Sequence, residues 1–163
     1  MKASATVEVR RPIEDVFSYV ADVEAMDEWV VGVGETRRVS GEETTVGTRY
    51  ESTYTYGGRT QPMVLELTAI DAPHRLEMTA VEGPFPFDAR LDLSETPQGT
   101  LVTNTIDNKP DGRFTAVMFT LFRPLMRWLM ARQLRGELRE LKARLEADVE
   151  TYQPPAPGET SVN

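Results

Sequence analysis

Apolar and polar residues alternate along seven short stretches of the chain, as they do in strands that bury one face. The stretches are 5–10, 31–39, 47–56, 63–70, 75–81, 85–93 and 100–107. Short turns such as YGGRT and TPQG separate most of the later ones, so neighbouring strands should be antiparallel. The pattern therefore predicts seven strands at near-regular spacing.

A helical pattern interrupts this series after the first strand. Ile13, Val16 and Phe17 recur at three- and four-residue steps, which places them on one face of a helix. Pro12 suits its first turn, where the missing N–H would be unpaired anyway. We expect Asp22 to end this helix and to accept a hydrogen bond from the first N–H groups of a second short helix.

A third helical pattern covers residues 114–152. Arg123 and Arg127 interrupt its apolar first part, so we predict no transmembrane segment. Pro124 should kink or split the helix. Beyond the proline, one apolar stripe runs through Met126, Met130, Leu134, Leu138, Leu141 and Leu145. Leu125, Trp128 and Leu129 lie on a different face.

The order of these elements predicts an α+β fold. A seven-stranded antiparallel sheet must bury one face, and only the last helix is long enough to cover it. A curved, strongly twisted sheet wrapped around one helix leaves a space between the two, and the two short helices would close one end of that space. We predict one domain over residues 1–152 and a disordered, proline-rich tail over 153–163.

Composition excludes several function classes. The chain has 163 residues, no cysteine and one histidine, so we expect no disulfide, no metal site and no cofactor. Its net charge of −8 opposes binding to nucleic acids, which we do not expect as partners. Its start lacks the apolar run of a signal peptide, which favours a cytoplasmic location.

Several segments together resemble a known superfamily. These are VEVRRPIEDVFSYVADVEAMDEWVVGV, VGTRY, LTAIDAPHRLEM, GTLVTNTID and LKARLE. They are similar to the START-like (SRPBCC, Bet v 1-like) helix-grip superfamily, and most of all to its polyketide cyclase/dehydrase and lipid-transport branch. The resemblance spans roughly residues 3–150 and implies a fold built around one deep cavity. Members of the superfamily include binders of hydrophobic small molecules, plant hormone receptors and aromatase/cyclases.

The inward faces of the predicted elements would line that cavity, although any single member is more often ordinary core. The candidates for ligand binding from the helix pair and the sheet are Phe17, Trp29, Tyr50, Tyr54, Leu67, Met78, Phe85, Phe87 and Asn104. Asn104 could hydrogen-bond a ligand carbonyl or a buried backbone group. His74 falls in a turn and should be solvated, and we expect the strand carboxylates to face outward.

Two explanations compete for the apolar face around Trp128. It could gate the cavity, with Met118, Leu121, Phe122 and Leu125 facing the ligand. Alternatively, it could be an exposed patch that pairs with a second copy in a homodimer or touches a membrane surface. The fold favours the gate.

No nucleophile, metal set or acid–base pair emerges from the sequence. We therefore predict binding or carriage of a hydrophobic small molecule, either aromatic and polyketide-like or lipid-like. The resemblance supports one alternative, a polyketide aromatase/cyclase that acts on a poly-keto chain in the same cavity, although no catalytic residue can be assigned. A third hypothesis is an accessory domain that acts on a partner through Trp128 and its neighbours.

Overall fold

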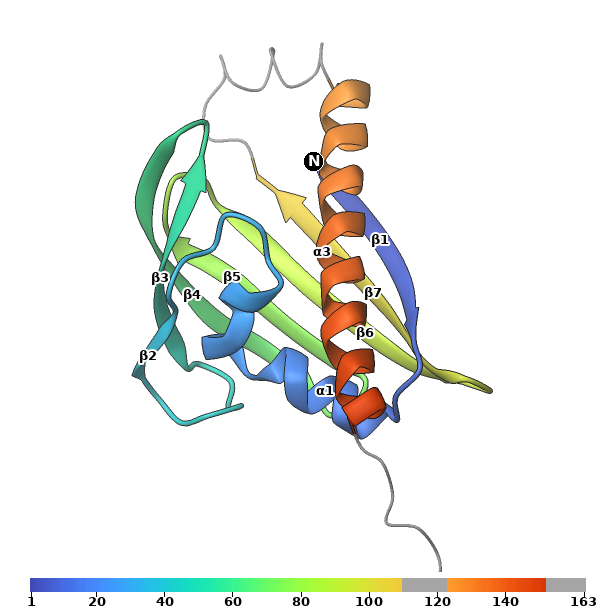
Figure 1. The fold of residues 1–163 in the computed structure, drawn as a ribbon. Coiled ribbons are helices and arrows are strands. Elements are labelled where there is room, and N and C mark those ends of the chain that lie inside the picture. The colour runs from blue at the N-terminus through green and yellow to red at the C-terminus, as the bar shows by residue number, and fades with distance from the viewer. Residues whose placement is uncertain (110–122, 152–163) are drawn as a thin grey trace, which may run out of the picture.

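A computed structural model describes residues 1–109 and 123–151 (Figure 1). The strands are β1 (Lys2–Val9), β2 (Arg37–Ser40), β3 (Arg49–Tyr56), β4 (Arg59–Asp71), β5 (Arg75–Glu82), β6 (Phe87–Thr96) and β7 (Gly99–Asn108). The helices are α1 (Ile13–Ala21), the 3-10 helix η1 (Val23–Glu28) and α3 (Arg123–Thr151). The predicted tail and the predicted helical residues 114–122 lie outside the described residues.

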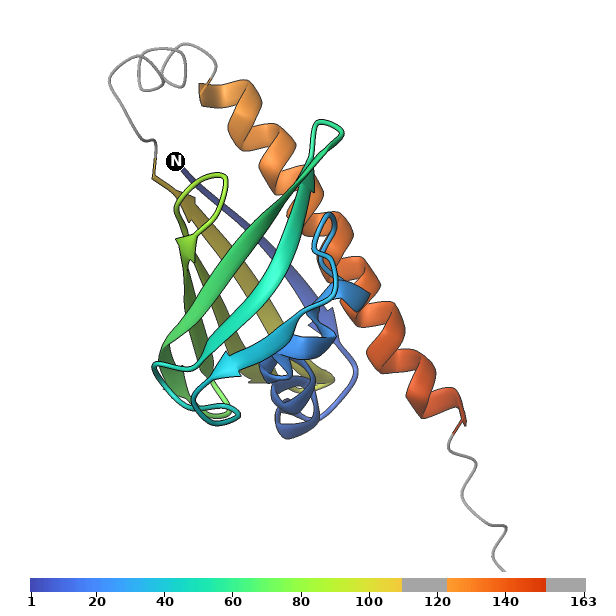
Figure 2. The same cartoon turned by 90° about the vertical axis from the view of Figure 1, so that its left-hand side faces the viewer.

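The strands form one antiparallel sheet in the order β1-β7-β6-β5-β4-β3-β2. Between β4 and β5 the register shifts twice, between Val64 and Leu65 and again between Leu67 and Ala69. Such bulges bend and twist a strand pair. Figure 2 shows the resulting curvature, with β3 and β4 crossing the direction of β1 and β7. The predicted helix-grip architecture is confirmed: seven antiparallel strands, short helices at one end and a long C-terminal helix.

Helix α3 packs against β1 and β7 through the second half of its apolar stripe (Figure 1). Leu134, Leu138, Leu141 and Leu145 are all buried, as predicted, whereas Met126 and Met130 are only half-buried. Polar contacts fix the same end, because the Arg11 side chain donates to the carbonyl oxygen of Leu145 at 3.0 Å. The helix is therefore docked along its C-terminal half.

Pro124 lies in the first turn of the described helix, which begins at Arg123. A proline at such a position disturbs no hydrogen bond of the turns that follow. The predicted kink would lie between α3 and the residues before Arg123, which are outside the described residues. The kink therefore stays a prediction.

Helices α1 and η1 close one end of the sheet, as predicted (Figure 1). The predicted cap at Asp22 is wrong, because its side chain makes no capping hydrogen bond to either helix. Instead, its backbone carbonyl accepts the Ala25 N–H at 3.1 Å. The second helix is a 3-10 helix, whose tighter i to i+3 bonds begin at Asp22 and join the two helices directly.

The prediction of a strand over 31–39 is correct only at its end. Regular pairing begins at Arg37, and an isolated bridge joins Val33 to Tyr54. Gly32 has a φ of +85°, a value that breaks an extended strand. A Cβ atom on Gly34 would lie 2.2 Å from Thr53 Oγ1. These glycines let an irregular segment pass close over β3, where the alternating pattern alone suggested a strand.

The alternation correctly separates the two faces of the sheet. Leu65, Leu67, Leu91 and Val102 are buried. On the outer face, charged residues pair across strands, as Arg49 does with Glu66 at 2.7 Å. Asp92 likewise binds Arg75 and Arg90, at 3.0 and 2.6 Å, and Asp88 binds Lys109. The expectation that these carboxylates face outward is confirmed.

Candidate functional site

A cavity of about 490 Å³ lies between the sheet, the α1–η1 end and α3. That volume falls within the range of small-molecule sites in proteins. Its lining comes from α1, η1, the segment after η1, five strands, the loop before β6 and α3. The cavity exists because α3 is docked by its C-terminal half, so that Met126 and Met130 near its start face the open space.

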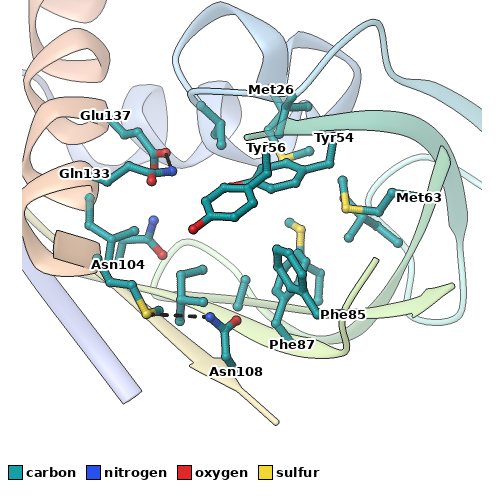
Figure 3. A pocket seen from close by; sticks show the side chains of 18 of the residues that line it. Met26, Tyr54, Tyr56, Met63, Phe85, Phe87, Asn104, Asn108, Gln133 and Glu137 are labelled. Atoms are coloured by element: carbon teal, nitrogen blue, oxygen red, sulfur yellow. Dashed lines mark hydrogen bonds between the residues drawn. The ribbon is translucent and has the colours of Figure 1, made fainter. Parts of the chain in front are cut away.

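One wall of the cavity is aromatic and sulfur-rich (Figure 3). Phe85 meets the ring of Tyr54 edge-on, with centroids 5.6 Å apart and planes at 86°. The Phe87 ring lies 6.3 Å from that of Phe85. Met63 and Met78 line the same space from β4 and β5. Flat rings and flexible thioethers can adapt to the shape of an apolar ligand.

Polar side chains gather on the opposite side, where β7 faces α3 (Figure 3). We call Asn104, Gln133 and Glu137 the polar corner; all three line the cavity. Glu137 is only 3% exposed, and its Oε1 accepts a hydrogen bond from Gln133 Nε2 at 3.0 Å. The same oxygen accepts the backbone N–H of Val31 at 3.2 Å. A buried carboxyl group thus ties α3 to the segment after η1 and borders the cavity.

Burial raises the pKa of Glu137 above its ordinary value, and the hydrogen bonds from Gln133 and Val31 only partly oppose this. At pH values between the ordinary pKa of Glu137 in the unfolded chain and its raised pKa in the fold, Glu137 is protonated in the folded state but not in the unfolded state. Lowering the pH through that window therefore stabilises the fold. A group of raised pKa in a cavity is also a recognised mark of functional sites.

The variant Glu137→Gln tests this linkage. Since glutamine does not titrate, we expect the free energy of unfolding of the wild type, relative to the variant, to increase as the pH falls from 8 towards 4.5. Urea unfolding of both proteins at several pH values measures the difference. Parallel profiles for the two proteins would show that Glu137 titrates normally.

Two polar atoms that border the cavity region have no hydrogen-bond partner among the described residues. They are Trp29 Nε1 and Asn104 Oδ1. Both side chains line the cavity, and both residues are 5% exposed. An unpaired buried polar group costs about 1 to 3 kcal/mol, so such groups are usually satisfied by something bound beside them.

The structure brings six of the predicted ligand-binding residues together around the cavity. They are Trp29, Tyr54, Met78, Phe85, Phe87 and Asn104. Phe17, Tyr50 and Leu67 are buried in the core instead and do not line it. Whether the six bind a ligand stays a prediction.

The remaining candidates belong to the predicted gate. Leu125 is 52% exposed and does not line the cavity. Its neighbours Trp128 and Leu129 are also exposed and do not line the cavity either. Met118, Leu121 and Phe122 lie outside the described residues. The exposure of Leu125 gives the gate no support from the described part of α3, and a homodimer through this patch stays a prediction.

Sequence reasoning missed Glu137 and Gln133. A signal was present: Glu137 follows Leu134 by three positions and precedes Leu141 by four, which places it on the buried stripe. A carboxylate on such a stripe is unusual enough to mark a site. His74, by contrast, is exposed in the turn between β4 and β5, as predicted.

Fold and cavity define the chain as a helix-grip protein with an internal apolar site. The family model for polyketide cyclase / dehydrase and lipid transport matches residues 1–146, so the chain belongs to that family. No match was found among curated proteins. Among the described residues, no helix is long and apolar enough to cross a membrane.

Solved structures share the fold at low sequence identity. TTHA0849 from Thermus thermophilus superposes with a TM-score of 0.73 at 21% identity, over 91% of this chain and 99% of that one. A START superfamily protein from Mycobacterium smegmatis gives 0.70 at 16% identity, over 90% and 97%. The di-domain ARO/CYC protein StfQ of the steffimycin biosynthetic pathway gives 0.65 at 14% identity, over 92% and 52%. These similarities show a shared fold.

Proposed function

We propose that the protein binds a hydrophobic small molecule, aromatic and polyketide-like or lipid-like, inside the cavity. The observation that carries this proposal is the cavity of about 490 Å³ with its wall of Tyr54, Phe85 and Phe87. Transfer of a ligand's apolar surface from water to such a wall supplies about 25 cal/mol per Å² before the costs of association. Membership in a family described by polyketide cyclisation and lipid transport supports the same interpretation.

Native mass spectrometry of the freshly purified protein tests the proposal directly. We expect a retained apolar mass, or selective adducts when fatty alcohols, sterols and polycyclic phenols are added. An unliganded spectrum with every compound would contradict it.

A variant that fills the cavity provides a second test. Ala89 lies in β6 between Met78 and Ile106 and lines the cavity. We expect Ala89→Phe to weaken binding of an adduct-forming ligand at least tenfold in calorimetric titration, because the added ring occupies the ligand's space. Ser94→Phe adds the same ring on the exposed face of the same strand and should leave affinity unchanged. Equal affinity in both variants would place the ligand elsewhere.

A second candidate function is a polyketide aromatase/cyclase. One observation favours it: Glu137 is a buried carboxyl group of raised pKa at the cavity, which is the kind of group that exchanges protons during enolisation. A cyclase should convert a poly-β-keto mimic and lose turnover in Glu137→Gln while it still binds the mimic. A carrier should return the mimic unchanged.

A further inference from the structure

We infer that the cavity selects neutral apolar ligands that carry a hydroxyl group and rejects ligands whose polar end is a carboxylate. The inference rests on the proposed function and names its ligand class. It follows from the charge and the unused hydrogen-bonding capacity of the polar corner.

Glu137 gives the cavity a buried carboxyl group that is negative in its ionised form and whose second oxygen is available. Both hydrogen bonds that it accepts go to Oε1, from Gln133 and from the Val31 backbone, and none of the described residues donates to Oε2. A ligand hydroxyl could donate its proton to this oxygen. A ligand carboxylate would instead bring a negative charge into a space with few polar groups, and the ionised form of Glu137 would repel it.

The cationic groups that line the cavity are already paired among the described residues. Lys109 binds Asp88, and the amino group of Met1 binds Asp107 at 3.4 Å. The lining also includes Tyr54 and Tyr56, whose phenol groups carry no positive charge. No arginine belongs to the described lining. An anionic ligand would therefore meet Glu137 without a free cation to compensate.

Asn104 makes a hydroxyl the best complement. Its Oδ1 accepts no hydrogen bond within the described part of the chain, although the residue is only 5% exposed. Its amide offers both a donor and an acceptor, whichever way it is turned. A hydroxyl group likewise donates and accepts, so it complements the unpaired oxygen of Asn104 as well as the free oxygen of Glu137. Figure 3 shows both side chains on the same side of the cavity, across from Phe85 and Phe87.

Three matched ligands test the inference on the full chain. Naphthalene, 2-naphthol and 2-naphthoate share one ring system and differ in their polar group. In calorimetric titration at pH 7.5, we expect 2-naphthol to bind at least tenfold more tightly than naphthalene and 2-naphthoate to bind at least tenfold more weakly. If 2-naphthoate binds as tightly as naphthalene, the inference is overturned. Binding of none of the three overturns the proposed function, and the inference with it.

Variants assign the selectivity to the polar corner. Glu137→Gln should raise the affinity for 2-naphthoate at least tenfold and leave that for naphthalene unchanged. Asn104→Leu should remove most of the advantage of 2-naphthol. Glu140→Gln is the matched control, since Glu140 lies on the outer face of α3 and pairs with Arg144. If Glu137→Gln discriminates against 2-naphthoate as strongly as the wild type does, the assignment to Glu137 is overturned. The comparison of the three ligands uses the wild type alone, so it does not depend on whether any variant folds.

Discussion

Leu141→Ala is expected to lower the free energy of unfolding by about 2 to 5 kcal/mol, the usual cost of a leucine removed from a well-packed core. Leu141 is fully buried at the centre of the docked half of α3, between Leu138 and Leu145. The surrounding strands cannot collapse onto the helix without moving the whole sheet. The midpoint and slope of urea unfolding measure the loss.

Leu129→Ala is the control on the same helix. Leu129 is 43% exposed, so its truncation should change the free energy of unfolding by no more than about 0.5 kcal/mol. A similar loss in both variants would mean that the first half of α3 is packed as tightly as the second. In that case the cavity would not owe its space to the way in which the helix is docked.

The uneven docking of α3 links the fold to the site. From Leu134 onwards the stripe is buried against β1 and β7, and Lys142 adds a hydrogen bond to the Glu8 carbonyl oxygen at 2.8 Å. Towards its start, the stripe changes to Met130 and Met126, which line the cavity. One helix therefore covers the core with its second half and forms a wall of the ligand space with its first.

Much of the fold could be predicted from the sequence because burial on one face of a sheet imposes alternation. Leu65 and Leu91 follow that rule in their strands. The rule failed over 31–39, where Gly32 and Gly34 let the chain pass close over β3. It also placed the start of a strand at Phe85, whereas β6 begins at Phe87 and Phe85 lies in the loop before it.

The candidate site was less predictable, because alternation identifies a face but not the place along it where packing ends. Leu65 and Leu67 lie on the same face of β4, yet Leu65 lines the cavity and Leu67 does not. That difference depends on the distance between α3 and the sheet, which no local pattern encodes. Glu137 was missed for another reason, since the buried stripe of the helix was defined by its apolar residues alone.

Gly99→Ala is the second variant with a large expected effect, a loss of about 2 to 4 kcal/mol in the free energy of unfolding. Gly99 opens β7 after the β6–β7 turn and pairs with Thr96. A Cβ atom there would lie 2.1 Å from the carbonyl oxygen of Val9 and 2.9 Å from the Arg10 Cα. These are backbone atoms at the end of β1, so no side chain can rotate away to relieve the clash.

Gly136→Ala provides the contrast, because nothing lies within 4 Å of a Cβ atom built on Gly136 in the middle of α3. Alanine has the higher helix propensity, so this variant should gain about 0.5 to 1 kcal/mol. Thermal and urea unfolding of the two variants should therefore move in opposite directions from the wild type. A wild-type stability for Gly99→Ala would show instead that the β6–β7 turn can move away from the end of β1 without loss of packing.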